Sequence, residues 1–228
     1  MKTILIANLI ALFLIGCGGS EDPGTGTNTL KVVAGVEAKE QVPNASGAND
    51  FDVTFEVWVT KDGRQVSDAL VVITLDGDEE LLLDQGDILE GRYTGSRVGY
   101  PTSVELDVES GGDNVKDAMV LCPDIHVFTS PTSGQVVPAG QDLEVLWERE
   151  ERADAAELES RKEGKLEIED TGSYILDATH FPKKPDKQED DHITLWRTQR
   201  VGLEGGVGGS ELSVMVRNRV EFIVDTTP

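Results

Sequence analysis

Cysteine is almost absent from this 228-residue chain, which contains only Cys17 and Cys122. Small secreted domains that depend on a disulfide framework need several cysteine pairs, so that class of fold is excluded. Histidine is nearly as scarce, and His126, His180 and His192 show neither the HxH nor the HExxH spacing of a zinc hydrolase. We therefore predict no metal site built from these side chains.

Other signatures of catalysis are missing as well. The chain has no G-x-S-x-G nucleophile motif, and its glycine-rich stretch 202–209 lacks the Lys-Ser/Thr pair of a phosphate-binding loop. The acidic side chains are numerous enough to bring two carboxylates to the spacing used by glycosidases, but the sequence distinguishes no such pair. We predict no catalytic residues, no cofactor and no enzymatic activity.

Basic and aromatic residues are also few. The chain has 20 Lys and Arg against 43 Asp and Glu, a formal net charge of −23. This excess of negative charge argues against binding to nucleic acid and against electrostatic docking on anionic lipid. Aromatic residues make up 5% of the chain, few for a glycan site that displays coplanar rings. Trp58 is the candidate for such a site, and Trp196 fits either face of its strand.

A long hydrophobic run is absent too, because the apolar stretch Ile4–Ile15 is shorter than the roughly 20 residues that span a bilayer. Its position after Lys2 is typical of a secretory signal. The four residues Leu14-Ile15-Gly16-Cys17 resemble the lipobox of bacterial lipoproteins. The resemblance implies that residues 1–16 are a signal peptide and that Cys17 carries a diacylglyceryl thioether. The alternative is a secreted protein with an unmodified Cys17.

The stretch after this cysteine is rich in Gly and Thr, so we predict a lipidated flexible tether over residues 17–29. Several acyl chains together would hold the protein on the membrane, because each buried CH₂ contributes roughly 0.8 kcal/mol. Gly18, with no Asp beside Cys17, resembles the sorting signal for an outer membrane. The predicted location is the bacterial cell envelope, with the membrane as one partner through the lipid and an envelope protein as another.

We predict a first β-sandwich domain over residues 30–122. Strict apolar and polar alternation over Phe51–Thr60 indicates a half-buried antiparallel strand. The continuous apolar run Ala69–Leu75 favours a strand covered on both faces. Together with the Gly-x-Tyr-x-Gly motif at 91–95, these features of residues 51–122 resemble bacterial immunoglobulin-like and carboxypeptidase-regulatory-like modules.

We predict a second β-sandwich domain over residues 123–228. The run SPTSGQVVPAGQDLEVLW, residues 130–147, resembles the opening of immunoglobulin-like or fibronectin-like modules, with Trp147 as a core residue. The charged segment 148–165 favours a loop with one helical turn, and residues 212–224 form a long final strand. The predicted fold class is all-β, with two tandem immunoglobulin-like sandwiches. Cys122 ends an apolar strand, where a buried thiol and a reactive thiol are both possible.

Two functional hypotheses follow. The first is a non-enzymatic, lipid-anchored envelope protein that serves as a structural or protein-interaction module. The second is a surface module that binds a glycan or peptide, assisted by calcium. The acidic loops at 76–87 and 189–191 offer oxygen ligands for calcium, but they lack the spacing of an EF-hand, so solvated loops are the other interpretation.

Overall fold

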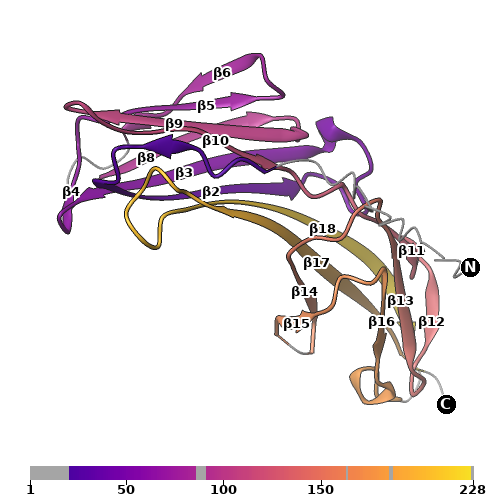
Figure 1. The fold of residues 1–228 in the computed structure, drawn as a ribbon. Helices are drawn as coiled ribbons and strands as arrows, with labels where there is room; N and C mark the ends of the chain where they lie inside the picture. Colours follow the sequence, from indigo (N-terminus) through magenta and orange to yellow (C-terminus); the bar gives the residue numbers. More distant parts are fainter. Residues whose placement is uncertain (1–20, 86–90, 163, 185–186, 227–228) are drawn as a thin grey trace, which may run out of the picture.

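The computed structural model describes residues 21–85, 91–162, 164–184 and 187–226. Apart from two 3₁₀ turns, η1 (Ala48–Asp50) and η2 (Ala178–His180), the regular structure in these ranges is β. The strands form sheets of five, three and ten strands (Figure 1). None of the described helices has the length and apolar character needed to cross a membrane. The prediction of an all-β fold of stacked sheets is confirmed.

The largest sheet runs through the whole molecule and is referred to below as the long sheet. Its central strands β18 and β2 are parallel, as are β12 and β18, whereas its other neighbouring strands are antiparallel. Two short strands attach to it, β12 (Val136–Pro138) on β18 and β4 (Arg64–Gln65) on β3. In spatial order the long sheet contains β15 (Leu166–Ile168), β14 (Ala155–Ser160), β17 (Gln188–Gly202), β18 (Glu211–Asp225), β2 (Leu30–Glu40), β3 (Phe51–Lys61), β8 (Arg92–Val98) and β7 (Asp84–Gln85).

Two smaller sheets cover the long sheet at its two ends (Figure 1). The five-stranded sheet lies over β2, β3 and β8, and the three-stranded sheet lies beside the other end of β17 and β18. In spatial order the five-stranded sheet contains β1 (Thr25–Gly26), β10 (Asp113–Leu121), β9 (Ser103–Ser110), β5 (Leu70–Leu75) and β6 (Glu79–Leu82). The three-stranded sheet contains β11 (Val127–Ser130), β13 (Leu143–Glu148) and β16 (Ser173–Leu176).

Strand β18 contributes to both hydrophobic cores from a single face. Its residues Leu212, Val214 and Val216 belong to the first core, under the five-stranded sheet. Further along the same strand, Phe222 and Val224 belong to the second core, under the three-stranded sheet. Side chains two residues apart share a face of a strand, so both small sheets pack on the same side of the long sheet. The opposite side of the long sheet carries neither core.

The two cores meet at a buried polar residue of β18. Asn218 lies on the same face as the apolar residues and is fully buried. Its amide nitrogen donates to the carbonyls of Ala45 (2.8 Å) and His126 (2.7 Å), and its oxygen accepts from the amide of Ala45 (3.1 Å). This residue therefore fixes two loops against the strand where one core ends and the other begins. We call this region the junction.

Several expectations about individual segments can be compared with the structure. Trp147 lies in the second core with 4% exposure, as predicted. The prediction that Ala69–Leu75 is covered on both faces is wrong, because Val71 and Ile73 are buried while Leu70 is 49% exposed. The assignment of 148–165 to a loop is also wrong over β14, which pairs with β17 and buries alternate residues.

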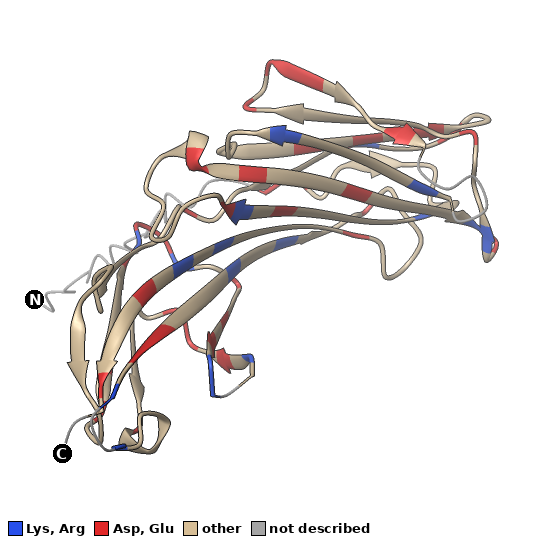
Figure 2. Cartoon of the chain, turned by 180° about the vertical axis from the view of Figure 1, so that it is seen from behind, with Lys and Arg blue, Asp and Glu red and all other residues tan. Residues whose placement is uncertain are grey.

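The predicted domain boundary at 122/123 stays a prediction. The structure adds that β17 and β18, which lie in the second predicted domain, also complete the first core through Val201 and Leu212. Charged residues follow no such division, since Asp and Glu occur on all three sheets, with Lys and Arg among them on the two larger sheets (Figure 2). The two halves are joined by continuous strands rather than by a linker.

Candidate functional site

The most unusual side chains of the molecule are a buried ion pair at the junction. The Nε and Nη2 atoms of Arg197 each lie 3.0 Å from Oδ2 of Asp170. Both side chains are buried, with exposures of 0% and 1%. Arg197 also donates through Nη1 to the carbonyl of Asp124 (2.7 Å) and through Nη2 to the carbonyl of Glu151. The guanidinium is thereby surrounded by acceptors from three separate segments.

The carboxylate of Asp170 is satisfied by further donors. It accepts hydrogen bonds from the indole Nε1 of Trp147 (3.2 Å) and the amide of Ala153 (2.8 Å). Burial alone would raise the pKa of Asp170, but the Ala153 amide and the Arg197 guanidinium outweigh it and hold this pKa below its usual value. The pair therefore remains ionised, and it links β13 of the three-stranded sheet to β17 of the long sheet.

His126 is buried beside this pair and is not placed to act as a general base. Its ring packs edge-to-face on Phe128, with the centroids 5.8 Å apart, and neither ring nitrogen has a hydrogen bond of normal geometry to a described residue. Burial lowers the pKa of His126 to about 3, and the charge of Arg197 acts in the same direction. The imidazole is therefore neutral near pH 7 and out of contact with solvent.

Cys122 lies in a cleft of about 1160 Å³ at the junction, between the two halves. The thiol is partly buried and packs against the first core. Burial raises the pKa of the Cys122 thiol, with Asp76 adding to the effect. The nearby Tyr100 hydroxyl donates to the carbonyl of Pro123 (2.7 Å). A raised pKa disfavours the thiolate, so this cysteine has the environment of a structural residue rather than a nucleophile.

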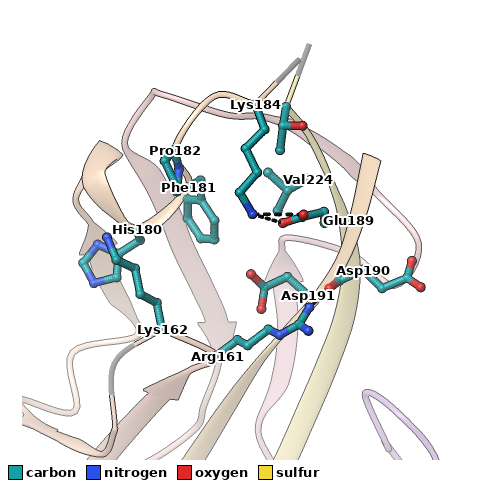
Figure 3. Close-up of a pocket in the computed structure, with 11 residues that line it drawn as sticks. Arg161, Lys162, His180, Phe181, Pro182, Lys184, Glu189, Asp190, Asp191 and Val224 are labelled. Carbon is teal, nitrogen blue, oxygen red and sulfur yellow. Dashed lines mark hydrogen bonds and ion pairs between the residues drawn. The ribbon is translucent and has the colours of Figure 1, made fainter. Parts of the chain in front are cut away.

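A second cavity, of about 620 Å³, lies at the far end of the second half (Figure 3). Charges of both signs line it and are largely paired with neighbours. Lys184 Nζ lies 2.6 and 2.9 Å from the two carboxylate oxygens of Glu189, and Arg161 donates to the carbonyl of Asp190 (3.0 Å). Hydrogen bonding to Lys184 lowers the pKa of Glu189. His180 and Phe181 complete one wall, and the arrangement shows no preference for a ligand of one charge.

The predicted acidic loops do not assemble an ion site among the described residues. The carboxylates that lie close enough to share a cation are instead Glu105, Asp107 and Asp117, whose oxygens fall within 4.8 Å of one another. Asp76, from the first predicted loop, accepts hydrogen bonds from the amide and the hydroxyl of Thr102, both at 2.7 Å. The i, i+2 spacing of Glu105 and Asp107 on a strand is the sequence signal that could have identified this group.

Trp58 and Trp196 both lie on the side of the long sheet that carries neither core, but they are too far apart to form one binding surface for a sugar. Trp58 is partly buried, and its Nε1 donates to Oε1 of Glu56 (2.6 Å). Trp196 is 7% exposed, with Lys165 Nζ 4.0 Å from its ring centroid. Their pairing partners on the intervening strands are six residues apart along β2, which corresponds to about 20 Å. The two rings therefore cannot bind one small sugar together.

Cys17, the predicted lipid attachment site, lies outside the described residues. The described chain begins at Glu21, whose side chain accepts a hydrogen bond from Gln199 Nε2 (2.7 Å).

Sequence reasoning missed the Arg197–Asp170 pair, although Ile193, Leu195 and Arg197 alternate on the buried face of β17. A charged residue at a position where the alternation predicts a buried apolar one was the signal that could have identified the pair.

No family model matches the chain, and no curated protein matches it. Among solved structures, the fibronectin(III)-like modules of Clostridium thermocellum CbhA are similar over 82% of this chain and 92% of theirs. The identity is 14% and the TM-score is 0.27. A likeness of this size carries no argument about function.

Proposed function

We propose that this protein is a non-enzymatic, lipid-anchored component of a bacterial cell envelope that serves as a structural or protein-interaction module. The observation that carries the proposal is the long sheet, whose strand β18 belongs to both cores. Such continuity favours a stiff body that presents a fixed surface, since relative motion of the halves would break packed strands. The lipobox-like residues 14–17 support the anchor.

The side chains most able to do chemistry support a non-catalytic role. His126 is buried, and the thiol of Cys122 has a raised pKa. The two carboxylate oxygens of Glu189 are already paired with Lys184 in the cavity of Figure 3. A general base or a nucleophile must be accessible and must have a pKa near the working pH. The three side chains named above do not meet both conditions. The separation of Trp58 and Trp196 does not favour the glycan-binding alternative.

The anchor is tested on the protein isolated from its native membranes. Mass spectrometry of the N-terminal peptide should find cleavage before Cys17 and fatty acyl groups on this residue. A Cys17→Ala variant should lose the modification and leave the membrane fraction, whereas a Cys122→Ala variant should remain membrane-bound. An unmodified thiol at Cys17 in the mature protein would contradict the anchor.

The interaction role is tested by chemical cross-linking in native envelopes followed by affinity capture. We expect the wild-type protein to recover one protein partner at a constant ratio, and the unanchored Cys17→Ala variant to recover much less of it. Recovery of glycan without protein would instead support the ligand-binding alternative.

A further inference from the structure

The segment that follows the predicted lipid site is fixed to the fold from Glu21 onward. Asp22 forms an antiparallel bridge with Met119, with N···O distances of 3.0 and 2.9 Å in the two directions. Glu21 is held by the side chain of Gln199 (2.7 Å). The chain is therefore attached to β10 and β17 at its first described residues, within the stretch 17–29 that the sequence predicts as tether.

Gly24 shows how closely this segment packs. It adopts φ +74°, and a Cβ atom there would lie 2.4 Å from the carbonyl oxygen of Lys116. Only glycine fits such a contact. From the next residue on, β1 pairs with β10, with Thr25 opposite Lys116. The attachment is thus made by the backbone along several consecutive residues, and it cannot be released by moving one side chain.

This attachment leaves a short connection to the membrane. Cys17 and Glu21 are four residues apart in sequence, so their Cα atoms can be separated by at most about 14 Å. We propose that the protein rests directly on the bilayer through the edge of its first half formed by β10 and β17, without an extended stalk. This inference rests on the proposed lipid anchor at Cys17.

The strand order defines which edge faces the bilayer and which faces away. Across the five-stranded sheet, Met119 on β10 pairs with Glu105, which pairs with Thr74, which pairs with Glu80 on β6. Three strand spacings place β6 about 14 Å further from the anchor. Leu82 of β6 is 60% exposed and marks this distal edge. In the long sheet, β14 and β17 lie toward the anchored edge, and β7 is the last strand at the other edge.

Negative charge flanks the anchored edge. Asp22 lies near the group formed by Glu105, Asp107 and Asp117 and acts electrostatically on Glu105. These carboxylates repel anionic headgroups over about 10 Å at 0.1 M salt. The surface that fits this edge is therefore a zwitterionic bilayer, and the lipid must supply the attachment.

The proposal is tested with the full chain, isolated from bacterial membranes after its natural processing, in phosphatidylethanolamine and phosphatidylcholine vesicles that contain a nickel-chelating lipid. Spin labels are placed on Arg152→Cys or Leu82→Cys, each in a Cys122→Ser background. Arg152 lines a small cavity together with Glu21 and Gln199, so it marks the anchored edge. We expect nickel to relax the Arg152 label several-fold more strongly than the Leu82 label. Inserting about a dozen Gly and Ser residues after Ser20 should abolish the difference.

Failure of the direct seating and failure of the lipid anchor give different results. If the protein floats with the vesicles but nickel relaxes both labels equally, the direct seating is overturned and the lipid anchor stands. If the protein does not float, the anchor itself is overturned, and the seating falls with it. Hydrogen exchange of the unlabelled wild-type protein gives an independent readout, since β10 and β14 should gain protection on vesicles while β6 should not.

Discussion

The two hydrophobic cores are built on the same face of one sheet, yet they differ in what they bury. The first is apolar except for two side chains, because among the described residues of its strands and loops the buried polar ones are Glu40 and Ser210. The second core ends at the junction in Arg197, Asp170 and His126, all of them buried. The first half thus depends on apolar burial, whereas the second also depends on every charged partner being present.

The strongest way to break this comparison is to remove the shared strands. A fragment of residues 21–122 lacks Leu203, Leu212 and Val214 from its core and leaves β2 without its neighbour β18. We expect the fragment to be unfolded, as measured by circular dichroism and proton NMR dispersion. Co-expression with residues 123–228 should restore the fold. A fragment that folds alone with native stability would show that the first core does not need β17 and β18.

The next largest effect should come from breaking the buried ion pair. Arg197→Met removes the cation that is hydrogen-bonded to the buried Asp170 carboxylate and leaves Arg149, at 3.9 Å, as the more distant one, so we expect a loss of about 3–5 kcal/mol of unfolding free energy. Urea denaturation measures this loss. The double variant Arg197→Met/Asp170→Leu should recover part of it, because no unpaired charge then remains. Equal stabilities of the wild type and Arg197→Met would contradict the role assigned to the pair.

A smaller, pH-dependent effect should come from His126. Its pKa is near 6.5 in the unfolded chain and is lowered by burial to about 3 in the folded protein. Between these values the unfolded state binds the extra proton, so the unfolding free energy falls as pH decreases below 6.5, by up to about 1.4 kcal/mol per pH unit. His126→Leu should flatten this slope between pH 6.5 and 5, where few carboxylates titrate. His192→Gln serves as the control, and an unchanged slope in His126→Leu would count against the buried neutral imidazole.

The smallest effect should come from an ion pair on the surface of the first half. Arg92 and Glu56 are 41% and 42% exposed in their side chains, so solvent screens their attraction. Arg92→Met should therefore reduce the unfolding free energy by about 0.2–1 kcal/mol, although Arg92 also lies over the ring of Trp58 at 5.8 Å. Urea denaturation of Arg92→Met and Arg197→Met in the same experiment compares the two losses of unfolding free energy directly. A loss as large as that of Arg197→Met would remove the distinction between the two halves.

The parts of the fold that the sequence predicts well are those with simple alternation. The strand predicted over 51–60 is observed as Phe51–Lys61, and the one predicted over 212–224 as Glu211–Asp225. β14 was missed because its Ala and Glu residues are poor strand formers by composition, and burial against β17 decides its conformation. The Arg197–Asp170 pair joins residues 27 apart in sequence, so only the fold brings them together.

The sequence could not predict that both cores share β17 and β18, for a related reason. A sequence pattern reports that a strand has one apolar face, but it does not report which sheet covers each part of that face. The even-numbered residues of β18 form one series that is apolar except at Asn218. The structure shows that this asparagine marks the change from one core to the other.

Equilibrium unfolding in urea, followed by hydrogen exchange at single residues in both halves, tests the central claim that one sheet unites the two cores. Amides of β5 and β9 report on the first core, and amides of β13 and β16 report on the second. If both cores depend on β18, all four strands should lose protection in one transition with a common midpoint. Two transitions, with the first core still protected after the second has unfolded, would contradict the account.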